Sequence, residues 1–451
     1  MALALGGGAL MRLLMLKALP QITGDTLLYG NLAKNLLHGQ FAITDGNGVA
    51  HETLIRLPGY PLFLAACFRL FGLDNYNAVC YLQIGLDLAG CLLLADCVRR
   101  IARPAIKDGA ALWTLFLAAL CPFTAAYAVA PLSETPTLFC IALALWALAR
   151  FHAQPGWPGA LAFAVAVAYA ALLRPDGALV GVALVPALVT GLRHSAIARM
   201  RLVRMAAVCV LLAILPFAIW TARNWRVFHV FEPLAPRYAT DPGEPTNPGW
   251  QRWVKTWCLD FVSTYEIYWN VPGSPFDISK LPSRAFDSPA EYAQTAALVA
   301  AYNDNGQDLS PDLDAQFARL AERRIKAHPL RYYVWLPLGR MTDMWLRPRV
   351  ENLNIDLDWW VYSHHYAETR FSWAYAGLNA TYLLLALAGL CFRPRYWPWM
   401  VLYFALRSAL LMTIEAPEAR YTLECFPFVF ALAGIGAHGG IRKLSRMIAR
   451  R

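Results

Sequence analysis

The sequence predicts an all-α polytopic membrane protein with about ten transmembrane helices and a mostly helical segment on the outer side. Hydrophobic residues make up 58% of the 451 residues and charged residues only 16%, whereas an average soluble chain is about 25% charged. The apolar residues form runs that suit a bilayer core about 30 Å thick, which takes roughly 20 helical residues to cross. Lys and Arg gather between alternate runs. This composition excludes disorder, coiled coils and most soluble folds.

Ten apolar runs are predicted to span the membrane. They lie at residues 3–20, 77–97, 109–127, 133–149, 158–173, 177–192, 205–222, 372–392, 397–414 and 421–438. No small-residue cleavage motif follows the first run, so we expect a retained helix rather than a signal peptide. Residues 331–347 are apolar but contain Arg331, Arg340 and Asp343, which favours an interfacial helix over a further span.

The net charge of +10 is divided unevenly between the two sides of the predicted membrane protein. Segments 98–107 and 193–204, the C-terminal tail and three further arginines place sixteen basic residues on one side if the ten spans alternate. With Asp96 and Asp108 this side carries +14, which leaves −4 for the rest. The positive-inside rule makes this side cytoplasmic. The basicity is thus an orientation signal, and no nucleic-acid partner is expected.

The spans predict three parts. Residues 1–222 form an N-terminal transmembrane core whose first outer loop, 21–76, carries candidate catalytic residues. Residues 223–371 form a periplasmic or outer segment with interfacial helices, and 372–451 form the last spans and a basic tail. In the outer segment, Ser310-Pro311-Asp312 predicts a helix start and His328-Pro329 its end near Ala327.

Aromatic residues in the outer segment recur at spacings of three and four, which predicts one helical face. They are Trp250, Trp253, Trp257, Phe261, Tyr265 and Tyr268. We expect this face to pack on the domain core or lie at the membrane interface. A wall that contacts a lipid or sugar is the alternative.

Two acids at the outer ends of different helices could face one pocket. Asp25 lies in GDTLLYGNLAKNLLHG after the first span, and Glu134 lies in PLSETPTLF at the start of the fourth. Each has a structural alternative: Asp25 as a helix N-cap and Glu134 as a favourable charge at a helix start.

Four arginines, Arg56, Arg174, Arg223 and Arg420, lie at the same outer level, where topology does not require positive charge. A phosphate at the membrane surface is a good reason for them, since an arginine fork binds phosphate bidentately. The alternatives are snorkelling or ion pairs, such as Arg174 with Asp176 or Arg420 with Glu418.

Asp87 and Arg407 fall within predicted spans, where charge is expensive. We expect structural pairing with each other or with the backbone, and a proton relay is the alternative. His364-His365 near Asp356 and Asp358 could bind a metal, although an exposed loop explains them better. The sequence lacks the common nucleotide, zinc and serine-hydrolase motifs.

These motifs resemble the GT-C class of integral-membrane glycosyltransferases, in particular the family-39-like group of protein O-mannosyltransferases and lipid A aminoarabinose transferases. The resemblance rests on GDTLLYGNLAKNLLHG, RLPGYPLFLA, PLSET, LLRPDGAL, ARNW and ARYTLECFPF, and on their order along the predicted outer face. In layout it covers most of the chain. Thr26 stands where many relatives have a second acid.

The resemblance implies a polyprenyl-phosphate-linked sugar donor and a GT-C-like fold. Asp25 and Glu134 would be the catalytic acids, with Asp25 as base. Arg56 would contact the donor phosphate, with Arg174, Arg223 and Arg420 as weaker candidates. Tyr29, Tyr60 and Tyr421 in these motifs are candidate substrate contacts. No cofactor is certain, and a divalent metal stays open because relatives differ.

The sequence thus predicts an inverting glycosyltransferase at the outer face of the cytoplasmic membrane. Membrane lipids and a glycan, lipid or protein acceptor are its expected partners. A secondary transporter or lipid flippase is the first alternative, supported by Asp87 and Arg407 alone. A non-catalytic membrane assembly subunit is the second, with the outer segment as a docking surface.

Overall fold

A computed structural model describes the chain except residues 20–21, 23, 194–198, 359, 361–364 and 450–451. The described part forms two compact units. The first unit comprises Met1–Glu244, Ala380–Phe404 and Leu423–Arg451, and the second comprises Pro245–Asn379 and Ala405–Thr422. The three-part division predicted from the spans stays a prediction.

The first unit is a helical bundle with one small hairpin. It begins with α1 (Ala2–Ala18), α2 (Gly24–Leu37), the antiparallel strands β1 (Ala42–Thr44) and β2 (Ala50–Glu52), and α3 (Gly59–Phe71). It continues with α4 (Tyr76–Ile101), α5 (Lys107–Ala119), α6 (Pro122–Ala128), α7 (Glu134–Ala153), α8 (Trp157–Leu173), η1 (Pro175–Gly177), α9 (Ala178–Arg193) and α10 (Arg199–Phe228). The division between the units runs through α16 (Tyr366–Leu390), α17 (Trp397–Leu411) and the 3-10 segment η6 (Ala419–Cys425), and α18 (Phe426–Ile448) belongs to the first unit.

The predicted all-α class is confirmed, since the described residues have one two-stranded sheet and are otherwise helices and connections. Each predicted span coincides with a helix, or for 109–127 with the pair α5 and α6, bent by 54°. By length and composition, α4, α7, α10, α16 and the stretch η6–α18 can cross a membrane, and the bent pair would be a sixth span. The other four predicted spans, α1, α8, α9 and α17, are helices of 15 to 17 residues.

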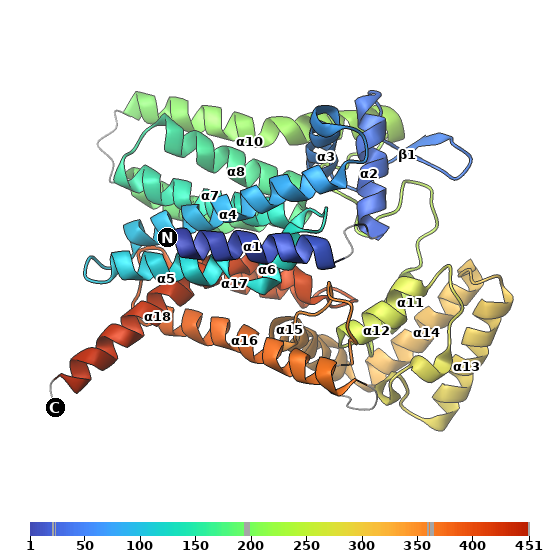
Figure 1. The fold of residues 1–451 in the computed structure, drawn as a ribbon. Helices are drawn as coiled ribbons and strands as arrows, with labels where there is room; N and C mark the ends of the chain where they lie inside the picture. Colours follow the sequence, from blue (N-terminus) through green and yellow to red (C-terminus); the bar gives the residue numbers. More distant parts are fainter. Residues whose placement is uncertain (20–21, 23, 194–198, 359, 361–364, 450–451) are drawn as a thin grey trace. The chain divides into compact units, whose positions relative to one another are not determined.

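Small residues let the helices of the first unit approach closely. Figure 1 shows α4, α7 and α8 side by side, and α18 packs against α5. At Gly434 of α18 an added Cβ would lie 2.0 Å from the Thr114 hydroxyl of α5. At Gly59 it would lie 2.5 Å from the Leu172 carbonyl, so glycine is needed where α3 meets α8. Such contacts are typical of membrane bundles, in which dispersion rather than water exclusion holds the helices together.

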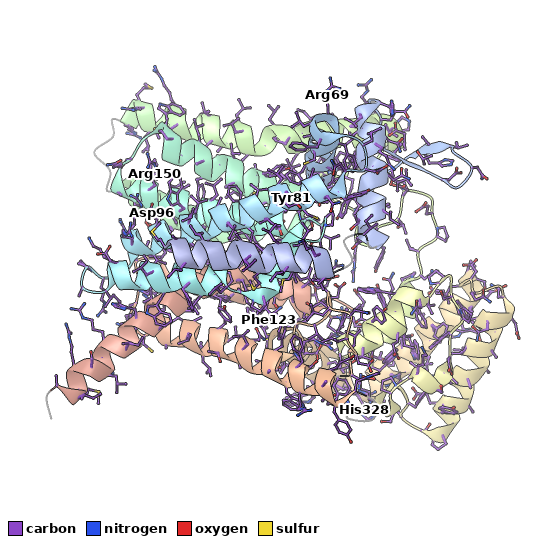
Figure 2. All side chains as sticks on the ribbon, in the orientation of Figure 1. Arg69, Tyr81, Asp96, Phe123, Arg150 and His328 are labelled. Atoms are coloured by element: carbon purple, nitrogen blue, oxygen red, sulfur yellow. The ribbon has the colours of Figure 1, made fainter. Side chains whose placement is uncertain are left out.

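Three of the segments that carry basic residues meet at one end of this bundle. The backbone N–H of Arg395 donates to the Ile101 carbonyl at 3.1 Å, and His152 lies 2.5 Å from the Tyr396 hydroxyl. Figure 2 shows Asp96 and Arg150 at this end and Tyr81 toward the other end of α4. Because α7 and α18 begin at Glu134 and Phe426 and end at this basic end, their first residues lie at the opposite end of the bundle.

The second unit has an aromatic core. Its helices are α11 (Pro248–Val254), α12 (Phe261–Glu266), α13 (Pro289–Asp304), α14 (Pro311–Ala327), the π-turn η5 (Arg331–Trp335) and α15 (Leu336–Leu346), with short 3-10 turns η2 (Tyr268–Asn270), η3 (Ile278–Lys280) and η4 (Ser283–Ala285). Trp250, Trp253 and Trp257 are fully buried in this core, so the predicted packing of these three is confirmed. Tyr265 is exposed.

The expectation of one continuous aromatic helix is wrong. The chain leaves the helical path after α11, and Asp260 begins α12 by accepting a hydrogen bond from the Ser263 N–H at 2.9 Å. A capping aspartate competes with the backbone for these hydrogen bonds and starts a new helix. By contrast, the predicted helix from Ser310 to Ala327 is confirmed, with the Ser310 hydroxyl as the N-cap.

Residues 331–347, predicted as an interfacial helix, form η5 and α15. Tyr333 and Trp335 are exposed on this stretch, as is Leu330 directly before it. The helical structure is confirmed, and the location at a membrane surface stays a prediction.

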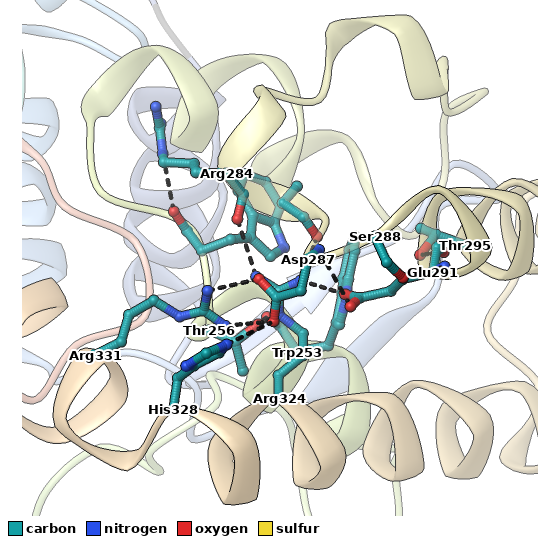
Figure 3. A network of polar contacts seen from close by, with 12 residues as sticks. Trp253, Thr256, Arg284, Asp287, Ser288, Glu291, Thr295, Arg324, His328 and Arg331 are labelled. Atoms are coloured by element: carbon teal, nitrogen blue, oxygen red, sulfur yellow. Dashed lines mark hydrogen bonds and ion pairs between the residues drawn. The ribbon is translucent and has the colours of Figure 1, made fainter.

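A buried arginine joins three parts of the second unit (Figure 3). Arg324 of α14 donates to the Ala285 carbonyl at 2.7 Å and to the Thr256 hydroxyl at 3.0 Å, and it pairs with Glu291 of α13. At the edge of this network, Arg331 holds Asp287 bidentately at 2.6 and 2.7 Å. These hydrogen bonds from Arg331 lower the pKa of the Asp287 carboxyl.

We expect the Asp287–Arg331 pair to make the second unit acid-sensitive. A carboxyl whose pKa is lowered on folding stabilises the protein above its ordinary pKa of about 3.9, and this stability is lost as the pH falls through the lower folded value. Asp287→Asn should cost about 1–3 kcal/mol at neutral pH, and the difference from wild type should shrink below about pH 4. Unfolding followed by tryptophan fluorescence measures it, and an equal difference at pH 7 and pH 3 would contradict the assignment.

Candidate functional site

The first pair of candidate residues joins α2 to the segment before α3. Asp25 lies in the first turn of α2, and Arg56 lies three residues before α3. Arg56 Nη2 is 3.4 Å from Asp25 Oδ1, and the two side chains are 28% and 34% exposed. A pair this exposed and this long contributes little to stability. Both side chains can therefore exchange partners when a ligand arrives.

Arg223 fixes the chain that leads into Arg56. Its guanidinium donates to the Thr53 carbonyl at 2.6 Å and the Phe41 carbonyl at 2.8 Å, and it pairs with Glu52. It also lies over the rings of Phe41, Trp220 and Phe228. These contacts hold the β1–β2 hairpin on α10. The contact of Arg223 with a phosphate stays a prediction.

A chain of aromatic and amide groups links α2, α3 and α4. The rings of Tyr29 and Tyr60 meet edge to face at 5.0 Å. The Tyr60 hydroxyl donates to Gln83 Oε1 at 2.9 Å, and Gln83 Nε2 donates to the Ala130 carbonyl at 2.7 Å. Tyr29 is half-buried and Tyr60 fully buried. Tyr60 therefore supports Tyr29, and its own contact with substrate stays a prediction.

The second charged group surrounds Arg174, at the end of α8. Arg174 Nη1 lies 3.0 Å from Oε1 of Glu134, the first residue of α7. Arg174 Nε lies 2.9 Å from Glu424 Oε1 and 3.4 Å from Asp176 Oδ1. The expected ion pair of Arg174 with Asp176 is confirmed, and Glu134 and Glu424 are nearly fully buried beside it.

Tyr29 connects the two charged groups. Burial raises the pKa of its phenol, while Arg56 and, more weakly, Arg174 lower this pKa. Asp25 and Glu134 act in the opposite direction and raise it. All four charges thus lie within electrostatic reach of one tyrosine. The structure brings together six of the predicted residues, Asp25, Tyr29, Arg56, Tyr60, Glu134 and Arg174, at the end of the first unit opposite the basic segments.

The remaining candidates, Arg420 and Tyr421, belong to the second unit. Arg420 Nη2 lies 3.2 Å from Glu418 Oε1, and the Tyr421 hydroxyl donates to the same oxygen at 2.8 Å. The expected ion pair of Arg420 with Glu418 is therefore confirmed. Arg407 donates to the Tyr421 carbonyl at 2.8 and 3.0 Å, which is the backbone pairing expected for it.

Asp87 pairs with Arg12 of α1, whose Nε donates to Asp87 Oδ2 at 2.7 Å. Arg12 Nη1 also donates to the Gly8 and Ala119 carbonyls at 2.9 and 2.6 Å. Asp87 thus forms a structural pair as expected, but the expected partner was wrong: it is Arg12 rather than Arg407 or the backbone.

The described residues contain no group of three or more His, Cys, Asp or Glu side chains placed to hold a metal ion. Asp356, Asp358 and His365 line one cavity of about 400 Å³ in the second unit. His364, the other part of that metal hypothesis, lies outside the described residues.

Glu424 and Gln83 were not among the site residues expected from the sequence. A signal for Glu424 was present: it is an acid just before an apolar helix, as Glu134 is, in the motif ARYTLECFPF. Gln83 has no comparable signal, because an amide inside an apolar run gains its role only through the hydroxyl that it meets.

Comparisons with known proteins come from family models, sequences and structures. Residues 56–220 match the model of the family described as dolichyl-phosphate-mannose-protein mannosyltransferase. No curated protein sequence gives a significant match. The predicted resemblance to the GT-C class of membrane glycosyltransferases is thereby confirmed. This family match begins at Arg56 and includes Glu134 and Arg174, whereas Asp25 precedes it.

Two solved structures resemble the chain. One is ArnT from Cupriavidus metallidurans bound to undecaprenyl phosphate, with a TM-score of 0.41 and 16% identity over 96% of this chain and 77% of that chain. The other is the archaeal oligosaccharyltransferase AglB from Archaeoglobus fulgidus, in complex with an inhibitory peptide and a dolichol-phosphate. Its TM-score is 0.47 and its identity 12%, and the alignment covers 99% of this chain but about half (51%) of AglB.

Proposed function

We propose that the protein is a membrane glycosyltransferase that moves a sugar from a polyprenyl phosphate to an acceptor, with inversion at the anomeric carbon. One observation carries the proposal: two acid–arginine pairs, Asp25–Arg56 at 3.4 Å and Glu134–Arg174 at 3.0 Å, lie at the end of the helical bundle opposite the basic segments. The name of the family that residues 56–220 match describes transfer of mannose from dolichyl phosphate to protein.

Arg56 is the residue that we assign to the donor phosphate. Its pair with Asp25 is long and partly exposed, whereas a phosphate can accept two short charge-assisted hydrogen bonds from a guanidinium. Donor binding would therefore draw Arg56 away from Asp25. The same exchange leaves the Asp25 carboxylate available to accept a proton beside the donor's sugar.

The reaction is a single displacement. The acceptor oxygen forms a bond to the anomeric carbon as the bond from that carbon to the phosphate oxygen breaks. The electron pair of the broken bond stays on the polyprenyl phosphate, whose charge Arg56 offsets. The acceptor's proton passes to Asp25. One base and no carboxylate nucleophile are needed, which is why the product is inverted.

The basic end of the bundle defines the sidedness of the proposal. Ile101, His152 and Arg395 share that end, and the positive-inside rule assigns it to the cytoplasm. Asp25 and Arg56 would then face the outside of a cytoplasmic membrane. The spans give the donor's isoprenoid tail an apolar surface that a soluble enzyme lacks. The expected acceptor is a glycan, a lipid or a protein.

The proposal is tested with the purified protein in liposomes that contain radiolabelled undecaprenyl- or dolichyl-phosphate sugars. We expect acceptor-dependent release of the polyprenyl phosphate and a product of inverted anomeric configuration. If no donor of the set is consumed in the presence of glycan, lipid and peptide acceptors, the proposed function is wrong.

We expect Arg56→Gln to raise the KM for the lipid-linked donor by about 10- to 100-fold, since charged hydrogen bonds contribute about 1.5–3 kcal/mol. Arg69→Gln is the matched control, because Arg69 is an exposed arginine on α3 (Figure 2). Steady-state kinetics with varied donor measures both variants. An unchanged donor KM for Arg56→Gln would remove Arg56 from the phosphate site.

A further inference from the structure

Arg174 is held by three carboxylates from three parts of the first unit. Glu134 starts α7, Asp176 lies in η1 after α8, and Glu424 lies at the end of η6, directly before α18. Glu424 Oε1 is 2.9 Å from Arg174 Nε, the shortest of the three contacts. The Glu424 side chain is 3% exposed. This contact is a close ion pair between buried groups, whereas the Nε–H of Arg174 donates its hydrogen bond to Asp176 Oδ1 at 3.4 Å.

The charges around Arg174 suit an internal role better than phosphate binding. One guanidinium faces three carboxylates, so an approaching phosphate would meet a net negative group. Among the described residues, the ion pair of Arg56 is with one acid, the partly exposed Asp25. Arg56 is therefore the more suitable residue to bind the donor phosphate, and Arg174 is better placed to orient the acids that surround it.

Glu424 and Glu134 contact different nitrogens of Arg174. Glu424 is at Nε and Glu134 at Nη1, so the guanidinium lies between two buried carboxylates, and the attraction of each one constrains its position. Without Glu424 the guanidinium would be attracted by Glu134 and Asp176 alone, which would shift the position from which Nη1 contacts Glu134. The start of α18 thereby controls an acid at the start of α7.

We propose that Glu424 is a positioning residue of the candidate site and acts through Arg174 on Glu134. This inference rests on the proposed glycosyl transfer and adds the C-terminal part of the chain to its site. Positioning affects the transition state more than donor binding, because small errors in orientation slow the chemical step.

A double-mutant cycle tests the inference in the full-length protein. The set is wild type, Glu424→Gln, Arg174→Gln and the double variant, assayed for transfer from undecaprenyl-phosphate-linked sugar. We expect Glu424→Gln to lower kcat about 10- to 100-fold with donor KM changed less than about threefold. The double variant should be no more than about threefold worse than the poorer single variant, since residues acting through one another are not additive.

Glu424→Asp keeps the charge on a shorter side chain, and we expect it to recover part of the lost kcat. It also replaces Glu424→Gln in the comparison if the latter does not fold. Asp96→Asn is the matched control: it removes a carboxylate that holds Arg100 and Trp146 at the basic end and should leave kcat unchanged. A kcat for Glu424→Gln within twofold of wild type, or losses that multiply in the double variant, would overturn the inference.

Thermal unfolding of the same four proteins separates this inference from the proposed function. The loss of melting temperature in the double variant should be smaller than the sum of the two single losses, because each single change already removes the same contact. An inactive wild type with such coupling would refute the proposed transfer and leave the Glu424–Arg174 contact standing. If the wild type is active and the variants show coupling neither in melting temperature nor in kcat, the inference is refuted and the proposed function is not.

Discussion

Asp25→Asn should lower kcat for sugar transfer by about 10²- to 10⁴-fold, the range that a general base contributes. Asparagine has the same shape as aspartate but cannot accept the acceptor's proton. The pair with Arg56 is long and partly exposed, so its loss should change the stability by less than about 1 kcal/mol. The variant should therefore fold and bind donor while failing in chemistry. Single-turnover transfer from labelled donor measures the chemical step directly.

Asp74→Asn is the matched control for this experiment. Asp74 lies in the same segment between α1 and α4 and pairs with Lys34 of α2 at 3.2 Å, with both side chains exposed. It thus repeats the Asp-to-Asn change in a surface ion pair on the same helix. Transfer by Asp74→Asn should match wild type. If Asp25→Asn retained more than about a tenth of the wild-type rate, Asp25 would lose its assignment and Glu134→Gln would become the next variant to assay.

The helices were predictable because their signals are local. Apolar runs set the length of each span, and the Ser310-Pro311 start placed α14 correctly to the residue. The aromatic face of residues 250–268 was predicted from the spacing of the aromatic residues alone. Spacing does not show where one helix ends and the next begins. There Asp260 caps a new helix, and the three tryptophans reach the core from α11 and the turn after it.

The partners of the charged residues were less predictable. Asp25 and Arg56 were each predicted to be site residues, and the structure pairs them, because both belong to the segment between α1 and α4. Asp87 was expected to pair with Arg407 or with the backbone, yet its partner is Arg12. Spacing along the chain indicates which level of a bundle a charge occupies, whereas packing decides which charges meet at that level. Glu424 was missed for the same reason.

The pairing of Asp87 also bears on the transporter alternative. A proton relay needs a carboxyl that can gain and lose a proton during the cycle. Asp87 is instead hydrogen-bonded to an arginine that is fully buried and also holds two backbone carbonyls. These contacts join α1, α4 and α5, and they describe a structural pair.

Asp87→Leu should therefore be among the most destabilising single changes in the first unit. It leaves the Arg12 guanidinium buried without a counter-charge, which costs about 3–5 kcal/mol when a buried pair is broken from one side. We expect the same range for Arg12→Met, which strands the carboxylate instead. Titration with a denaturing detergent in mixed micelles measures the free energy of unfolding.

The double variant Arg12→Met/Asp87→Leu decides whether the pair is structural. With both charges removed and apolar side chains of similar size in their place, the stability should return to within about 1–2 kcal/mol of wild type or exceed it. Sugar transfer should return with it, because neither residue belongs to the candidate site. A double variant that is stable yet inactive would instead show that the charges serve the reaction, since restored packing would then be insufficient for function.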